Sequence, residues 1–196
     1  MENLQKDYKK YKWFFTSTGK LVVGGKSAEQ NDFLLDYIKK TGKELLIMHT
    51  EEPGSPFSFI LSDLSKITPS DLKECAIFTG CFSRAWREGK KKAFVHIFNS
   101  SQIYKNEKMK TGTWGVVGKV KRMEVSLSLV LVKQKSVLRA VPEISVKKSE
   151  ILLCIAPGRI NKIDMLPKIQ LNLSEDISQE ELLSALPSGG LRILQK

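Results

Sequence analysis

The sequence predicts an α+β fold with a mostly antiparallel β-sheet, two main helices and a short C-terminal helix. Short strand-like apolar segments follow one another with few helical segments between them, which favours antiparallel pairing. Two segments begin with helix start signals, and a third, shorter one lies near the C-terminus. Apolar residues make up 41% of the chain, which is enough for a substantial core.

A strand pair and the first helix are predicted near the N-terminus. Residues Trp13–Val23 are largely apolar outside Ser17–Lys20, a polar stretch with a glycine that predicts a turn between two strands. Ser27 is suited to cap a helix, and Gln30 follows three residues later, as in a capping box. We expect this helix to end at Gly42.

The second helix carries the clearest signals in the chain. Thr68 would cap it, Pro69 occupies the first helical position, and Asp71 completes a capping box. Apolar and small residues then recur at three- and four-residue spacing as far as Trp86. This pattern predicts one continuous helix that stops at Gly89.

The remaining elements are mostly strands. A loop bounded by Pro53 and Pro56 separates the first two of them. The predicted strands are Glu44–His49, Phe57–Leu61, Ala93–Phe98, Trp114–Gly118, Glu124–Val132 and Ile151–Ile155. Ser178 with Glu181 predicts a short final helix that Pro187 ends.

The positive charge of the chain is unevenly distributed. The formal net charge is +11, and residues 143–196 contribute nothing because they hold 7 basic and 7 acidic residues. Residues 84–122 hold 11 basic residues against 2 acidic ones. Such a block predicts a surface that binds a polyanion, and a basic face that only meets solvent is the alternative. Arg84 and Arg87 lie off the apolar stripe, so both would point away from the core.

The change in charge near Pro142 predicts a boundary between two parts of the chain. Residues 1–141, which carry the basic block, would form a nucleic-acid-binding domain. Residues 142–196 would form a C-terminal extension with strand structure and a short helix, packed on the same sheet.

Several classes of protein do not fit the sequence. No apolar run approaches the ~20 residues that a membrane-spanning helix needs, and the N-terminus has no secretory signal, so we expect a cytoplasmic protein without membrane contact. The three cysteines and two histidines lack metal-ligand spacing, so we expect reduced thiols, no metal and no cofactor. No set of catalytic residues is recognisable, which favours a protein that is not an enzyme.

The segment Gly24, Gly25, Lys26 and Ser27 predicts an anion site. A phosphate-binding P-loop would need a glycine five positions before Gly25, and Lys20 stands there. Two glycines, a lysine and a capped helix start still suit a phosphate, because free N–H groups and the helix dipole favour negative charge. A simple tight turn is an equally good interpretation of the two glycines.

His49 and Ser55 are candidates for a local polar contact with a ligand. His49 ends a predicted strand, and Ser55 lies in the loop between two prolines that follows it. On one interpretation the histidine only hydrogen-bonds this loop. On the other it contacts a phosphate, a base or a sugar hydroxyl.

Trp86, Tyr104 and Trp114 lie in or beside the basic block, where aromatic side chains could stack on bases. Tyr104 occurs in a polar segment beside Lys105 and is the best candidate for stacking. Trp86 falls on the apolar stripe of the predicted helix, so we expect it in the core. Trp114 follows Gly112 and Thr113, and for this residue both base stacking and a structural role remain open.

Together these residues resemble the NFACT-R domain, the RNA-binding part of ribosome quality-control factors, which also occurs as a standalone protein. The resemblance covers residues 11–122. Its motifs are Trp13-Phe14 with Gly19, Gly24-Gly25, Gln30-Asn31, His49, Pro53-Gly54-Ser55, Ala76, Thr79, Ser83, Trp86, Thr111-Gly112-Thr113-Trp114 and Gly118-Lys119. Leu46-Ile47-Met48 stands where the family commonly has an acidic and aromatic pattern.

The resemblance implies a non-catalytic RNA-binding adaptor in translation or ribosome quality control, which contacts tRNA or the rRNA of the large ribosomal subunit. The large factors also carry other modules that this sequence lacks, so we expect a protein partner to supply them. Two alternatives stay open, an enzyme on RNA that uses His49 and a protein-interaction module on the ribosome. The residues predicted to contact RNA are His49, Ser55, Arg84, Arg87, Lys90, Lys91, Lys92, Tyr104, Lys105, Lys108, Lys110, Lys119, Lys121 and Arg122.

Overall fold

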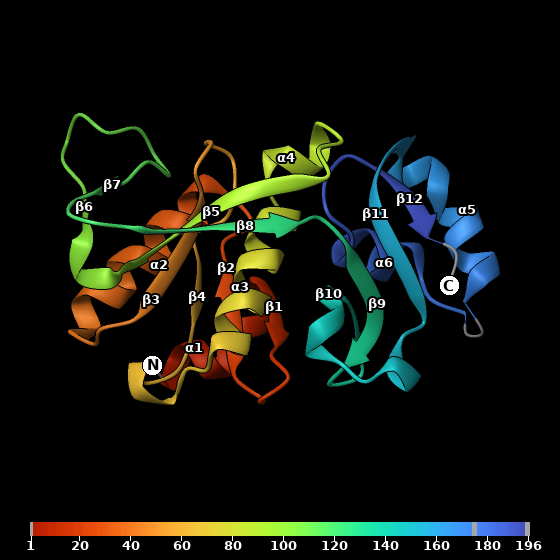
Figure 1. Cartoon of the computed structure of the whole chain (residues 1–196), viewed down its shortest axis with the longest axis horizontal. Coiled ribbons are helices and arrows are strands. Elements are labelled where there is room, and N and C mark those ends of the chain that lie inside the picture. Colours follow the sequence, from red (N-terminus) through yellow and green to blue (C-terminus); the bar gives the residue numbers. More distant parts are fainter. Residues whose placement is uncertain (1, 174–175, 195–196) are drawn as a thin grey trace.

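A six-stranded sheet forms the centre of the N-terminal part of the chain (Figure 1). The computed structural model describes residues 2–173 and 176–194. The strands of this sheet are β1 (Lys12–Phe15), β2 (Leu21–Gly24), β3 (Leu46–Thr50), β4 (Ser58–Ile60), β5 (Lys92–Asn99) and β8 (Lys121–Ser126). They lie in the order β1-β2-β4-β3-β5-β8, and each neighbouring pair is antiparallel.

Two helices cover the two faces of this sheet. Helix α2 (Ala28–Thr41) packs on one face and helix α3 (Pro69–Cys81) on the other. Because successive side chains of a strand point to opposite faces, neighbouring residues of β1 enter different cores. Trp13 belongs to the core under α2, and Phe14 belongs to the core under α3. The sheet is therefore buried on both sides.

A second, four-stranded sheet lies beyond α3 (Figure 1). Its strands are β9 (Leu129–Gln134), β10 (Val137–Val141), β11 (Leu153–Asn161) and β12 (Gly190–Leu194), and its helices are α5 (Lys162–Asn172) and α6 (Gln179–Ala185). The strand order is β10-β9-β11-β12, again antiparallel. Phe78 of α3 and Leu131 of β9 belong to one hydrophobic core, so both sheets pack around α3.

The other elements are short. They are α1 (Glu2–Asp7), α4 (Arg84–Arg87), β6 (Ile103–Tyr104) paired with β7 (Gly115–Val116), and the 3-10 turns Tyr8–Lys10, Leu64–Lys66, Ser100–Gln102, Glu143–Ser145 and Lys148–Glu150. No helix in the described part of the chain combines the length and the apolar character that crossing a membrane requires.

The predicted helix starts are confirmed. The side chain of Ser27 accepts a hydrogen bond from the backbone N–H of Gln30, and Gly42 ends α2 in the left-handed conformation. Gln30 accepts a hydrogen bond from the backbone N–H of Lys26, one residue earlier than a standard capping box would have it. At α3, Thr68 and Asp71 form the complete capping box.

The prediction of one helix from Pro69 to Gly89 was wrong, because α3 ends at Cys81. Ser83 causes the break, since it competes with the helical hydrogen bonds. Its hydroxyl donates to the carbonyl of Gly80 at 2.7 Å and accepts from the N–H of Ala85 at 3.1 Å, which caps the separate helix α4. The arginines of α4 therefore extend from an independent turn of helix.

The predicted strand Glu124–Val132 was also wrong as a single element. It consists of β8 in the six-stranded sheet and β9 in the four-stranded sheet, with Leu127 and Ser128 between them. An apolar run indicates a buried strand but not the sheet to which the strand belongs. The pattern therefore did not show that the chain passes from one sheet to the other. Helix α5 and strand β12 were not anticipated either.

The α+β class is confirmed by the mixture of helices and antiparallel sheets. The division of the chain at Pro142 stays a prediction. Strands from both sides of that residue form the four-stranded sheet, since β9 and β10 precede it and β11 and β12 follow it.

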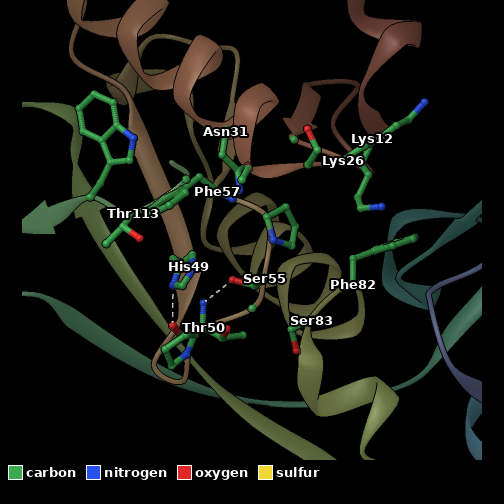
Figure 2. Close-up of a pocket in the computed structure, with 18 of the residues that line it drawn as sticks. Lys12, Lys26, Asn31, His49, Thr50, Ser55, Phe57, Phe82, Ser83 and Thr113 are labelled. Atoms are coloured by element: carbon green, nitrogen blue, oxygen red, sulfur yellow. Dashed lines mark hydrogen bonds between the residues drawn. The ribbon is translucent and has the colours of Figure 1, made fainter. Parts of the chain in front are cut away.

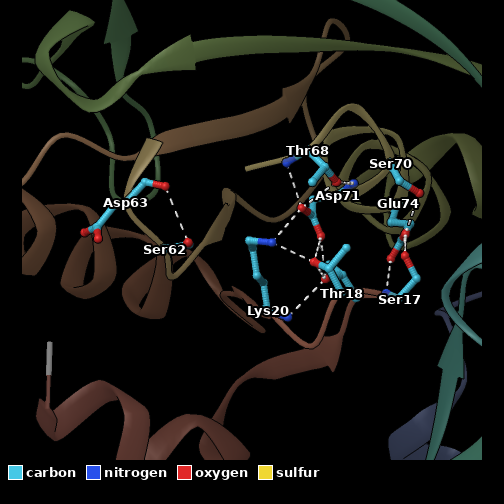
Figure 3. Close-up of polar contacts among 10 residues, drawn as sticks. Ser17, Thr18, Lys20, Ser62, Asp63, Thr68, Ser70, Asp71 and Glu74 are labelled. Atoms are coloured by element: carbon cyan, nitrogen blue, oxygen red, sulfur yellow. Dashed lines mark hydrogen bonds and ion pairs between the residues drawn. The ribbon is translucent and has the colours of Figure 1, made fainter. Parts of the chain in front are cut away.

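A buried polar cluster fixes the turn between β1 and β2 on the start of α3 (Figure 3). The Asp71 carboxylate accepts hydrogen bonds from the hydroxyls of Thr16 and Thr18, both at 2.6 Å. It also forms an ion pair with Lys20 at 3.0 Å. Glu74 accepts from the backbone N–H of Ser17 at 2.8 Å. Asp71 and Glu74 are fully buried, and their charges are stabilised because these donors surround them.

Candidate nucleic-acid interface

Four sequence motifs that lie far apart in the chain meet in one cleft of about 570 Å³ (Figure 2). The start of α2, the end of β3 with its following loop, the segment before α4 and the loop after β6 all line it. The lining residues that matter for its chemistry are Lys12, Lys26, Ser27, Asn31, His49, Ser55, Phe57, Phe82, Ser83, Arg87, Thr113 and Trp114.

The start of α2 is held against the start of β4. The Asn31 side-chain oxygen accepts a hydrogen bond from the backbone N–H of Phe57 at 3.2 Å. A Cβ atom on Gly25 would overlap this same oxygen, so the approach requires glycine there. The anion site that includes Gly25 stays a prediction, and the structure shows that this glycine lets the chain pass close to Asn31.

His49 presents a neutral ring in the middle of the cleft. Its Nδ1 atom lies 2.7 Å from the carbonyl oxygen of Thr50, and a carbonyl can only accept, so Nδ1 carries the proton. Burial lowers the pKa of His49 to about 4. The ring packs against Phe57, with centroids 4.4 Å apart. At neutral pH the remaining Nε2 atom is therefore a hydrogen-bond acceptor, which suits an N–H or O–H group and not a phosphate.

The loop after His49 is fixed by Ser55. Its hydroxyl accepts a hydrogen bond from the backbone N–H of Thr50 at 2.9 Å, and the residue is buried. Gly54 has a φ of 107° and its carbonyl accepts from the N–H of Arg84 at 2.8 Å. The loop is thus attached to the start of α4, which also brings Arg87 to the cleft.

The opposite wall comes from the loop between β6 and β7. Gly112 has a φ of 76°, and a Cβ there would clash with Ala28 of α2. The Trp114 indole donates a hydrogen bond to Asp32 at 2.7 Å, and the same carboxylate pairs with Lys105 at 2.6 Å. Trp114 is only 8% exposed, so it forms part of the wall.

Five of the basic residues predicted to contact RNA have acidic partners within the protein. The pairs are Arg84 with Glu88, Lys90 with Glu52 and Glu88, Lys92 with Glu124, Lys105 with Asp32, and Arg122 with Glu51, at distances of 2.6 to 3.0 Å. Most of the acidic partners lie outside residues 84–122, which is why the sequence alone suggested a stronger local charge.

The other six predicted bases form no ion pair within the described residues. They are Arg87, Lys91, Lys108, Lys110, Lys119 and Lys121. Of all the residues predicted to contact RNA, His49, Ser55 and Arg87 line the cleft. Tyr104 is 41% exposed and packs over the backbone of Gly115, outside the cleft lining.

Several cleft residues were not among the predicted contacts. Asn31 and Thr113 were noticed only as parts of motifs, and Lys12, Phe57 and Phe82 were not singled out individually. Phe57 and Phe82 lie next to the predicted motifs, and this proximity was the only available signal. Within the described residues, no three His, Cys, Asp or Glu side chains gather as a metal site would require.

Comparison with known proteins identifies the family. The family model described as the NFACT protein RNA binding domain matches residues 10–118, which is more than half of the chain. The chain belongs to the NFACT RNA-binding domain family. All residues that line the cleft lie within this match, except Ser188. The cleft is therefore a feature of the NFACT RNA-binding domain, with one contribution from the C-terminal part of the chain.

One curated relative is the archaeal Rqc2 homolog aRqcH of Methanocaldococcus jannaschii. It is 26% identical over 203 aligned positions, which cover 98% of this chain and 30% of the relative. The chain thus spans about a third of the length of that protein.

A solved structure shares the fold of this NFACT domain. It is the C-terminal part of the fibronectin/fibrinogen-binding protein from Streptococcus suis, with a TM-score of 0.53 and 20% identity, covering 60% of this chain and 45% of the other. At this identity the likeness concerns the fold alone.

Proposed function

We propose that this chain is a non-catalytic adaptor that binds tRNA or ribosomal RNA, with the cleft as the principal contact. The observation that carries the proposal is the meeting of its four motifs around His49, within a domain that belongs to an RNA-binding family. Single-stranded loops and ends of structured RNA are the parts whose bases are free to enter such a cleft.

The cleft suits a nucleoside with its phosphate. The Nε2 atom of His49 can accept a hydrogen bond from an amino group of a base or from a ribose hydroxyl. Thr113 lines the same space, and Arg87, which also lines it, can meet a phosphate.

The unpaired lysines outside the cleft would supply the longer-range attraction. Lys91 precedes β5, Lys121 is the first residue of β8 and pairs with Ile97, and Lys119 precedes β8. Because these side chains have no acidic partner among the described residues, their charge is available to phosphates and should make binding sensitive to salt.

The relative named as an Rqc2 homolog supports a role in ribosome quality control, and we extend that role to this chain as part of the proposal. On this account the RNA is presented on or near the ribosome, and the chain is cytoplasmic. Since the chain spans 30% of that relative, only the RNA-contacting part of its role is proposed here.

Fluorescence anisotropy tests the proposal. Labelled tRNA, an rRNA fragment and a duplex DNA of equal length are titrated across a salt series near physiological ionic strength. We expect a preference for RNA that His49→Gln weakens about tenfold, since one hydrogen bond in the cleft is lost or misplaced. Lys168→Gln on the exposed side of α5 is the control.

Equal binding to RNA and DNA that salt abolishes would show a general polycation and overturn the proposal. A product released from RNA in a manner that depends on His49 would show that the chain is an enzyme, and would overturn the non-catalytic role.

A further inference from the structure

A group of four basic side chains gathers where the C-terminal part of the chain meets the cleft. We call Lys12, Lys26, Arg139 and Lys162 the four-cation cluster. They come from β1, the segment before α2, β10 and α5. Only Lys26 belonged to a motif that the sequence pointed out.

The backbone brings the first three members together. Lys12 pairs with Gly24 across the β1–β2 ladder, so Lys26 follows only two residues after that partner. Arg139 donates a hydrogen bond from Nε to the carbonyl of Trp13 at 3.1 Å, next to Lys12 in the chain. Figure 2 shows Lys12 and Lys26 on the side of the cleft away from Thr113.

The cluster is partly buried and lacks acidic partners: Lys12 and Lys162 are half-buried, and Lys26 is exposed. Arg139 is 4% exposed, and its guanidinium lies 4.7 Å from the centre of the Trp13 ring. The Nζ atom of Lys12 lies 5.0 Å from the centre of the Phe82 ring. No carboxylate of the described residues forms an ion pair with any of the four cations. Lys162 donates to the carbonyl of Leu183 at 3.2 Å, a neutral acceptor.

Such an arrangement is unfavourable until an anion joins it. Burial, together with the charges of Lys26, Arg139 and Lys162, lowers the pKa of Lys12 to about 8. Burial likewise lowers the pKa of Lys26, with a contribution from Arg139. Like charges that share a partly dry site repel one another, and a bound anion would reverse this repulsion.

The start of α2 adds to the attraction for an anion. Ser27 caps this helix of 14 residues, and Lys26, Ser27 and Ala28 all line the cleft. The dipole of a helix favours a negative charge near its first turn. The positive charge of the cluster and the dipole of α2 therefore both favour an anion at this end of the cleft.

We propose that the four-cation cluster is a phosphate-binding site at the end of the cleft, which holds one phosphate group of the RNA. This inference rests on the function proposed above. Arg139 and Lys162 lie beyond residue 118, where the family match ends. The C-terminal part of the chain thus completes a binding site that begins in the NFACT RNA-binding domain.

The phosphate has two possible sources, a phosphodiester inside the RNA strand and a phosphate at its end. The test uses a short single-stranded RNA in three forms, with a 5′-phosphate, with a 3′-phosphate and with neither. Lys12→Gln and Lys26→Gln are made singly and together. Lys148→Gln with Lys168→Gln, both exposed, is the control with the same loss of charge.

We expect the double variant Lys12→Gln/Lys26→Gln to lower RNA affinity about tenfold and to reduce the slope of log K against log salt by about 0.7, the value for one phosphate of a single strand. The control should keep the wild-type affinity within about twofold. If the dependence on the two lysines is present in all three RNAs, the phosphate is internal; if it needs one end group, the phosphate is terminal.

A second readout does not depend on RNA binding. Lysine side-chain NMR should show the pKa of Lys12 rise when inorganic phosphate is added, because the anion stabilises the charged form. Wild-type affinity for RNA in the double variant, together with no response of Lys12 to phosphate in the wild-type protein, would overturn the site and leave RNA binding intact. A response to phosphate in a protein that binds no RNA would support the site and refute the proposed function.

Discussion

Arg122 and Glu51 lie 71 positions apart in the sequence, and their side chains form an ion pair with Nη2 and Oε2 2.8 Å apart. A second hydrogen bond joins Nε of Arg122 to Oε1 at 3.2 Å, and the guanidinium carbon lies 3.4 Å from the centre of the Phe94 ring. Arg122 thus already has a carboxylate and an aromatic face as partners. It exemplifies the division of the basic residues into those with partners inside the protein and those without.

This division predicts different effects for two pairs of lysines. Lys119→Gln with Lys121→Gln should reduce the salt slope of RNA binding by about 1.4, since two unpaired cations lose their phosphate contacts. Lys90→Gln with Lys92→Gln removes the same charge but acts on side chains paired with Glu52, Glu88 and Glu124, so its slope should change by less than half as much. Equal slopes for the two double variants would show that the ion pairs do not decide which lysines meet RNA.

The histidine of the cleft predicts a pH dependence of stability. The pKa of His49 lies at about 4 in the folded protein, lowered by burial, against the ordinary value of about 6.5. Between these values the unfolded chain binds more protons than the folded one, so stability is complete above pH 6.5 and falls as the pH drops towards 4. The loss should be about 2 kcal/mol between pH 7 and pH 5.

Urea unfolding at several pH values measures this loss, and His49→Gln should remove most of it. NMR titration of the ring gives the midpoint directly. A midpoint near 6.5 would mean that His49 is partly charged at neutral pH, and its role as a neutral acceptor would then be wrong.

The polar cluster under the β1–β2 turn predicts a large structural effect of one carboxylate. Burial raises the pKa of Asp71, but hydrogen bonds from Thr16, Thr18 and Thr68 outweigh it and hold the pKa below the usual range. Asp71→Asn should therefore destabilise the fold by about 3 kcal/mol at neutral pH, because buried donors lose a charged acceptor. The charged carboxylate contributes its full stabilisation above its ordinary pKa, and this contribution is lost progressively as the pH falls from about 4 towards the lowered pKa of the folded state.

Chemical unfolding at pH 7 and pH 3 measures this effect, with Asp63→Asn as the control. Asp63 is exposed and its carboxylate forms an ion pair with the exposed Lys66, so its replacement should hardly change stability. A destabilisation by Asp71→Asn that is equal at both pH values would show that the charge of Asp71 is not the cause.

Two glycines with positive φ should respond differently to replacement by alanine, because one is in open space and the other packs closely against a neighbour. Gly42 has a φ of 64° and open space around it, whereas Gly112 has a φ of 76° and packs against Ala28. Gly42→Ala should cost only the left-handed conformation, about 1–2 kcal/mol. Gly112→Ala adds a clash of about 1–3 kcal/mol and should also weaken RNA binding, because it moves the wall of the cleft.

Thermal unfolding and RNA titration of both variants check this pair. If Gly112→Ala matched Gly42→Ala in stability and retained full RNA affinity, the loop after β6 would not be part of the binding site.

The sequence predicted those parts of the fold that depend on local interactions. Ser27, Thr68 and Asp71 act within one helical turn, and each was found in the expected role. The break at Ser83 was missed because apolar spacing continues through it, and only the hydrogen bonds of the folded chain show the competition.

Contacts between segments that lie far apart in the chain could not be predicted from patterns in a single sequence. Arg139 reaches the carbonyl of Trp13 across 126 positions, and Trp114 reaches Asp32 across 82. The motifs that line the cleft were recognised one by one, but their meeting in space depends on the order of strands in the sheet. The acidic partners of the basic block could not be predicted for the same reason, because most of them lie in distant segments of the chain.

The central claim is that RNA enters the cleft around His49. Photo-crosslinking of 4-thiouridine-labelled tRNA near physiological salt, with the modified peptides mapped by mass spectrometry, tests it most directly. We predict cross-links within the segments 49–57, 82–87 and 111–114, which contribute lining residues to the cleft. Cross-links confined to the outer lysines of residues 90–92 and 119–121, with none in the cleft, would contradict it.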